Sequence, residues 1–201
     1  MRPTPRQALE AEGYIVVRGA LDAGWIGRLH RAFVSAPVQE GGTRHVRISE
    51  DTPEREAWRA LEGHEALLDA AALVLGQGPY SPDAHGRDPL PGFGQQGLHA
   101  DWPARPPGTP PMVLTALFML DPFTALNGAT RVVPGTHTRP DGVPRALAQP
   151  RAHHPDERVI TGDAGDVLLF NGHLWHSGRK NNSAGSRRTV QLVLRRAGLR
   201  A

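Results

Sequence analysis

The sequence predicts a mainly β protein with flanking helices, and three observations support this expectation. From residue 79 onward, short apolar runs alternate with turns rich in glycine and proline, as in β-sandwiches and barrels. Residues 4–76 instead carry apolar side chains at helical spacing. A length of 201 residues suits a single domain with a proper core. We therefore expect one domain over 1–201, with a helical part at about 1–76 and a β core at about 77–198 that closes as a double-sheet jelly roll.

Four helices and two short strands are expected in the helical part. The helices are predicted at 4–13, 21–34, 52–63 and 64–76. The first and the last of them end at a glycine, and the third opens with a Thr52 cap and with Pro53 at its first helical position. The strands are the β-like pieces YIVVRG at 14–19 and HVRIS at 45–49.

The β core is expected to contain six strands. They are predicted within 97–102, 112–120, 129–135, 157–162, 166–172 and 188–196. The segment PARPPGTPP at 103–111 is too rich in proline for a helix or a strand, so we expect a surface loop directly after the first of these runs.

Composition excludes several classes of function. The chain has no cysteine, so any metal ion must be held by nitrogen and oxygen atoms. Its longest apolar run, 113–120, is broken only by Thr115 and is too short to span a bilayer, and no apolar stretch follows the basic N-terminus. The net charge of +3 comes from scattered arginines rather than from a basic patch, which argues against a nucleic-acid partner. We expect a cytoplasmic protein that binds neither membranes nor nucleic acid, while its oligomeric state stays open.

One short stretch, QQGLHADWP at 95–103, carries the first chemical signal. On a strand, His99 and Asp101 share one face while Ala100 points away. The two side chains can form a structural hydrogen-bonded pair, or they can be two ligands of one metal ion. A third ligand is available after the turn at 171–172, where either His173 or His176 can supply it. Two histidines and one carboxylate form the facial triad of non-haem Fe(II) oxygenases.

Such a triad leaves three coordination positions open, which suits a bidentate 2-oxo acid and O2. A 2-oxo acid with a second carboxylate needs an arginine at its far end, because the guanidinium offers a rigid fork to a carboxylate. Arg187 and Thr189 are two residues apart on the last predicted strand and therefore share a face. Together they can clamp a carboxylate.

The chain resembles the phytanoyl-CoA dioxygenase family of Fe(II)/2-oxoglutarate oxygenases. The resemblance rests on the order His-x-Asp, then NGATRVVPGTH, then LWHSGRKNNSAGSRR, and also on the opening EAEGYIVVRGALDAGWIGRLHRAF. In that family the last histidine ligand precedes the 2-oxoglutarate arginine by eleven residues, which favours His176 over His173 and Arg187 over Arg188. The resemblance implies a double-stranded β-helix core, with Fe(II) bound by His99, Asp101 and His176. It also implies 2-oxoglutarate and O2 as co-substrates.

The resemblance further implies an oxygenase that hydroxylates an unactivated C–H bond of a small molecule and releases succinate and CO2. Desaturation, epimerisation and cyclisation use the same chemistry and stay open. Two features of the chain narrow the expected substrate and reaction. No region of the chain resembles one that grips a coenzyme A tail. A carboxylate is present as Asp101, whereas the related halogenases have a small residue at that position.

Three further residues are candidates for the pocket, each with a plainer structural alternative. Gln95 shares the face of His99 if the strand extends that far, although its amide can equally bond to backbone in a turn. Trp102 can line the 2-oxoglutarate pocket or belong to the core. Arg87 can bind an anionic group of the substrate from a proline-rich segment, or it can pair with Asp88 at the surface. Arg44 and Arg47 face opposite ways on a strand, so at most one of them can point inward.

A cupin-type jelly-roll metalloprotein that does not use 2-oxoglutarate, such as an isomerase or a sugar-binding protein, is the alternative. The segment GDVLLFNGHLWHSGRK has nearly the spacing of the second cupin motif. The first cupin motif needs two histidines and a glutamate near the first ligand, whereas here no glutamate occurs between Glu65 and Glu157. The oxygenase is therefore the favoured interpretation.

Overall fold

The computed structural model describes residues 3–34, 36, 38–39, 41–47, 53–104, 106 and 108–197. Its helices are α1 Pro5–Ala11, α2 Ala23–Arg31, α3 Arg55–Glu62 and α4 Glu65–Leu75, and a 3-10 turn η1 covers Thr136–Thr138. Its strands are β1 Tyr14–Val17, β2 Val38–Gln39, β3 Thr43–Val46, β4 Tyr80–Pro89, β5 Val113–Met119, β6 Thr130–Val132, β7 Arg158–Val159, β8 Val167–Asn171, β9 His176–Gly178 and β10 Thr189–Arg196. None of the helices in these ranges has the length and apolarity that a membrane crossing requires.

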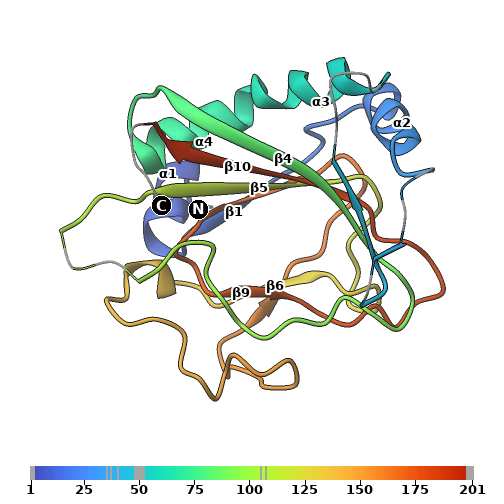
Figure 1. Cartoon of the computed structure of the whole chain (residues 1–201). Helices are drawn as coiled ribbons and strands as arrows, with labels where there is room; N and C mark the ends of the chain where they lie inside the picture. Colours follow the sequence, from blue (N-terminus) through green and yellow to red (C-terminus); the bar gives the residue numbers. More distant parts are fainter. Residues whose placement is uncertain are drawn as a thin grey trace.

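Two antiparallel sheets form the core. The larger one has seven strands in the order β1-β8-β5-β10-β4-β3-β2, and the smaller one has three in the order β7-β6-β9. Figure 1 shows the small sheet facing the middle of the large one, while α3 and α4 lie over the opposite face of the large sheet. The prediction of a mainly β jelly roll with flanking helices is therefore confirmed.

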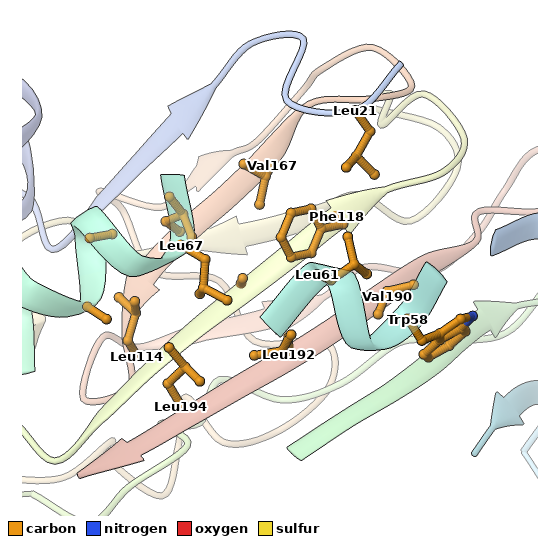
Figure 2. Packing of buried hydrophobic residues seen from close by; sticks show 14 of the residues in the cluster. Leu21, Trp58, Leu61, Leu67, Leu114, Phe118, Val167, Val190, Leu192 and Leu194 are labelled. Atoms are coloured by element: carbon orange, nitrogen blue, oxygen red, sulfur yellow. The ribbon is translucent and has the colours of Figure 1, made fainter. Parts of the chain in front are cut away.

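The two faces of the large sheet carry different side chains, because side chains alternate along each strand. On β10, Val190, Leu192 and Leu194 point toward the helices and join the main apolar cluster. Figure 2 shows this cluster, in which Leu61 and Leu67 of the helices meet the strand residues. The alternating residues Thr189, Gln191 and Val193 point to the opposite face, toward the small sheet. The helix-covered face thus stabilises the fold and leaves the other face available for a site.

Several predicted elements differ in the structure. The strand β4 is absent from the prediction because its sequence, YSPDAHGRDP, is polar and contains two prolines. The expected strand at 97–102 is reduced to an isolated bridge at His99. Helix α3 begins at Arg55 after an N-cap at Glu54, so Pro53 precedes the helix and does not occupy its first position. Thr52 and the end of the predicted strand at 48–49 lie outside the described residues.

Gly86 marks the contact between β4 and the helices, and replacing it by alanine is expected to destabilise the fold. An added Cβ would lie 2.6 Å from the Phe33 ring and 2.9 Å from Trp58 and Val46. Overpacking of this kind costs about 1–3 kcal/mol, which urea denaturation would measure. Gly27→Ala on α2 is the control, since nothing lies within 4 Å of its added Cβ and alanine in a helix gains about 1 kcal/mol over glycine. Equal stabilities for the two variants would contradict the packing argument.

Candidate metal centre and active site

His99 and His176 are brought together by their own backbones. The N–H of His99 donates to the carbonyl of His176 at 3.0 Å, and the N–H of His176 donates to the carbonyl of His99 at 2.9 Å. Residues paired in this way place their side chains on one face, and the two imidazole centroids are 4.5 Å apart. Asp101 joins them, so that one ligand atom from each of the three residues lies within 4.8 Å of the others. The predicted triad therefore converges at one point.

The two imidazoles are oriented for metal binding. Nδ1 of His99 lies 3.0 Å from the carbonyl oxygen of Gly97, and Nδ1 of His176 lies 2.9 Å from that of Leu174. When each Nδ1–H donates to its carbonyl, each Nε2 keeps its lone pair for a ligand, which is the usual arrangement of metal-binding histidines. Nε2 of His176 lies 3.4 Å from Oδ1 of Asp101. Two nitrogens and one carboxylate oxygen are the donor set of a facial triad for Fe(II), so the residues fit this metal.

Asp101 is held in its charged form. Burial alone would raise the pKa of its carboxyl group, but His176 and a hydrogen bond from Thr115 outweigh burial and keep the pKa well below its usual range. Burial likewise lowers the pKa of His176, and Asp101 outweighs that effect, so the pKa of His176 is raised. Asp101 and His176 thus each favour the charged form of the other.

Thr115 contacts the triad directly, and the sequence interpretation missed it. Its side chain is fully buried, and its hydroxyl donates to Oδ2 of Asp101 at 2.6 Å. This bond leaves Oδ1 to face the histidines. A signal was present in the sequence, because Thr115 is the only polar residue in the apolar run 113–120.

Thr115→Val is expected to weaken metal binding while leaving the fold intact. Valine keeps the volume but removes the donor that orients Asp101, and loss of such outer partners typically costs about 10- to 100-fold in metal affinity. Fe(II) or Ni(II) titration under anaerobic conditions would measure the change. Thr115→Ser keeps the hydroxyl and should retain most of the affinity. Equal affinities for the valine variant and the wild type would show that the hydrogen bond does not orient the ligand.

A cavity opens directly over the three ligands. Its lining combines the triad with polar and apolar residues from β4, β5, β6, β8, β9 and β10, from the chain just before β10 and from the segment before His99. These other lining residues are Arg87, Gln96, Leu117, Thr130, Phe170, Gly178, Arg187, Thr189 and Gln191.

Arg187 is a buried cation at the wall of this cavity. Only 7% of it is exposed, its guanidinium lies 4.7 Å from the centroid of the Phe123 ring, and its Nε has no hydrogen-bond partner. Burial and the nearby Arg87 lower the pKa of Arg187 to about 9, so it is still charged at neutral pH. Its backbone N–H donates to the buried carboxylate of Asp88 at 3.1 Å, which anchors the chain just before β10. No carboxylate in the described part of the chain forms an ion pair with this guanidinium, and a buried charge of this kind favours an anion.

Thr189 and Arg87 lie on the same face as Arg187. Thr189 begins β10, one residue later than the predicted strand, and it stands directly opposite Arg87 of β4. Arg87 therefore projects from a strand and not from the proline-rich segment that was predicted to carry it. Its neighbour Asp88 points the other way and is fully buried, so the alternative of a surface pair between Arg87 and Asp88 is wrong. Arg44 approaches Asp88 instead, at 3.5 Å, and Arg47 approaches Asp83.

Two other predicted site residues lie outside the cavity. Gln95 is exposed and donates to the carbonyl of Pro150, whereas Gln96 lines the cavity and accepts from the N–H of Gly178. The prediction for Gln95 was wrong because residues 93–98 do not form a strand, so the alternation counted back from His99 does not apply. Trp102 is half-buried and absent from the cavity lining. His173 bonds through Nδ1 to the carbonyl of Pro103 and does not join the triad.

Arg131 supports the centre from behind. It is almost fully buried on β6 and donates to Oγ of Ser177, the neighbour of His176, at 2.7 Å. It also donates to the carbonyl of Ala152 at 2.7 Å and to Glu157 at 2.8 Å. One side chain thus fastens the excursion between β6 and β7 to the strand that carries His176. Its sequence signal was its place in NGATRVVPGTH, one of the segments that carry the family resemblance, but that segment does not indicate its partners.

Two solved structures illustrate the similarity of this fold to known proteins. HygX from Streptomyces hygroscopicus, solved with nickel and 2-oxoglutarate bound, superposes with a TM-score of 0.79 over 98% of this chain and 89% of that one, at 17% identity. The α-ketoglutarate-dependent epimerase SnoN from nogalamycin biosynthesis superposes with a TM-score of 0.73 over 96% and 82% of the two chains, at 20% identity.

Sequence comparison leads to the family. Dioxygenase trt7 of Aspergillus terreus is 34% identical over 146 residues, which cover 69% of this chain and 44% of that protein. Dioxygenase cdmA of Talaromyces verruculosus is 36% identical over 113 residues, or 52% and 36% of the two chains. The chain thus spans less than half the length of these relatives. The model of the phytanoyl-CoA dioxygenase family matches residues 9–189, and the chain belongs to this family.

Proposed function

We propose that this protein is an Fe(II)- and 2-oxoglutarate-dependent oxygenase that hydroxylates an unactivated C–H bond of a small molecule, with release of succinate and CO2. One observation carries the proposal: the convergent ligand atoms of His99, Asp101 and His176 and the buried guanidinium of Arg187 line the same cavity. The family to which the chain belongs uses Fe(II), 2-oxoglutarate and O2.

Each residue of the site has a separate role in this proposal. His99, Asp101 and His176 hold Fe(II), which supplies the activation of O2 when it is bound there. Arg187 and Thr189 bind the far carboxylate of 2-oxoglutarate and so orient its other end toward the triad. Thr115 keeps Oδ1 of Asp101 directed at the metal site. Leu117 and Phe170 are the apolar part of the lining and exclude water from the reacting centre.

A substrate screen that reports succinate tests the cofactor and the substrate class together. Candidates are incubated with the protein, Fe(II), 2-oxoglutarate and O2, and succinate is measured alongside the mass of each product. We expect succinate release that depends on both Fe(II) and 2-oxoglutarate, and a product heavier by one oxygen atom. HygX was solved with hygromycin B bound, so polar natural products belong in the screen.

The outcomes separate the alternatives. A product of unchanged mass would indicate epimerisation, the activity named for SnoN, and a product lighter by two hydrogens would indicate desaturation or cyclisation. The cupin-type alternative predicts no binding of 2-oxoglutarate, so anaerobic addition of Fe(II) and 2-oxoglutarate should then give no charge-transfer absorbance in the visible region. The position of Arg187 in the cavity argues against that alternative.

A further inference from the structure

The charges around the cavity do not balance once the cofactors of the proposed function are counted. Among the described residues that line it, Asp101 is the only carboxylate, and Arg87 and Arg187 are the arginines. Fe(II) carries two positive charges, which Asp101 and the near carboxylate of 2-oxoglutarate would offset. The far carboxylate would offset Arg187. One positive charge, that of Arg87, is left without a counter-charge.

Arg87 has no other partner in the described part of the chain. Its guanidinium makes no ion pair or hydrogen bond there, and its sequence neighbour Asp88 faces away and is occupied by Ser186, Arg44 and the N–H of Arg187. Burial lowers the pKa of Arg87, and Asp101 raises it in part. Asp101 is thus the one acidic neighbour that attracts Arg87, and a bound metal would engage that carboxylate. Unpaired charges in a partly buried site are costly unless a ligand neutralises them.

The strands on either side of Arg87 extend the polar surface away from the metal. In the sheet register Arg87 is opposite His45 of β3 on one side and Thr189 of β10 on the other. His85 lies two residues earlier on β4, opposite Gln191, which also lines the cavity. Cross-strand partners and residues two apart share a face. Figure 1 shows β4 and β3 continuing the large sheet beyond β10, to one side of the small sheet.

These histidines can donate hydrogen bonds without adding charge. Nδ1 of His85 is buried and has no partner. Burial and then Arg87 lower the pKa of His85 to about 4 and also lower the pKa of His45, so both rings are neutral at pH 7. The other charged groups on this face, among the described residues around Arg87, are Asp83, Arg47 and Arg195. Asp83 lies 3.5 Å from Arg47 and 4.0 Å from Arg195. One fixed cation flanked by neutral donors is the composition of an anion-binding subsite.

The geometry points to a substrate subsite in which Arg87, together with His45 and His85, binds a carboxylate or phosphate group of the molecule that is oxidised. This inference rests on the proposed function, since Arg87 is in excess only when Fe(II) and 2-oxoglutarate fill the rest of the cavity. The anionic group would lie on the β3–β4 side, so the C–H bond that reacts would lie between that group and the triad.

Anion binding to the full chain, loaded with Ni(II) and saturating 2-oxoglutarate, tests the inference without any turnover. Inorganic phosphate and acetate are titrated separately by calorimetry, which distinguishes the two anion classes. We expect one of them to bind the wild type, and Arg87→Gln to weaken this binding by about 10- to 150-fold, the usual effect of losing a charged hydrogen bond. The affinity for 2-oxoglutarate should change by less than about threefold, since Arg187 is retained.

The control is Arg195→Gln, which makes the same charge change on the same face of the sheet but on the neighbouring strand β10. Arg195 lies six residues from Thr189 and is 41% exposed, so its loss should leave anion binding unchanged. Arg87→Lys should retain part of the binding because the charge remains while the fork is lost. Three results would overturn the inference: no binding of either anion to the loaded wild type, equal weakening in the Arg195 variant, or a loss of 2-oxoglutarate affinity in Arg87→Gln as large as in an Arg187 variant. A wild type that binds no 2-oxoglutarate would instead refute the proposed function itself.

Discussion

Alanine in place of His99, Asp101 or His176 is expected to abolish turnover and to weaken Fe(II) binding by more than the roughly 10- to 100-fold that follows the loss of an outer partner. Each change removes one of three ligand atoms that lie within 4.8 Å of one another. Asp101→Ala should have the largest effect on charge, because it leaves two imidazoles and no anion to hold a divalent cation. Anaerobic Ni(II) titration measures the affinity, and succinate release measures the activity.

His173→Ala is the matched control for these ligand variants. It removes a similarly buried imidazole three residues before His176. Nδ1 of His173 bonds to the carbonyl of Pro103 instead of facing the triad. Some loss of stability is expected from the cavity it leaves, while metal affinity should stay near that of the wild type. If His173→Ala lost metal binding and His176→Ala kept it, then His173, and not His176, would be the third ligand.

The central strands could be predicted because their sequences carry the physical signal directly. The apolar runs that became β5 and β8 are buried on both faces, and such strands read as continuous apolar stretches. On β10 the alternation placed Arg187, Thr189 and Gln191 along one wall of the cavity, although regular pairing begins only at Thr189. The spacing of eleven residues between His176 and Arg187 also favoured these two residues over His173 and Arg188. The sequence alone was thus sufficient to predict side-chain directions that depend only on the alternation within one strand.

The remaining parts depend on contacts between distant segments. β4 is polar because its inner face lines the site and its outer face holds the buried Asp88, so neither face resembles an ordinary strand. His99 is placed by a backbone bridge to His176 rather than by a strand of its own. Because the segment before His99 is not a strand, Gln96 lines the cavity in place of the predicted Gln95. Arg131 lies in the segment NGATRVVPGTH, but its partners are 21 to 46 residues away and that segment does not specify them.

The loss of Arg187 should affect 2-oxoglutarate and leave the metal in place. Arg187→Gln removes a charge-assisted pair to a carboxylate, which costs on the order of 2–4 kcal/mol, or about 30- to 1000-fold in affinity. Ni(II) affinity should stay within about threefold of the wild type, because the triad does not contact this side chain. Titration of 2-oxoglutarate into the Ni(II)-loaded protein measures the first quantity, and Ni(II) titration measures the second.

Arg188→Gln is the control, since Arg188 points away from the cavity and makes a two-pronged ion pair with Asp121. It should bind 2-oxoglutarate normally but unfold more easily. The Arg187 variant should behave in the opposite way. Its guanidinium is buried beside Arg87, and its Nε has no partner, so its replacement by a neutral side chain should leave the melting temperature at or above that of the wild type. A protein keeps such an unfavourable charge where a ligand neutralises it. Equal loss of 2-oxoglutarate affinity in both variants, or a lower melting temperature for Arg187→Gln than for Arg188→Gln, would show that Arg187 supports the fold and not the co-substrate.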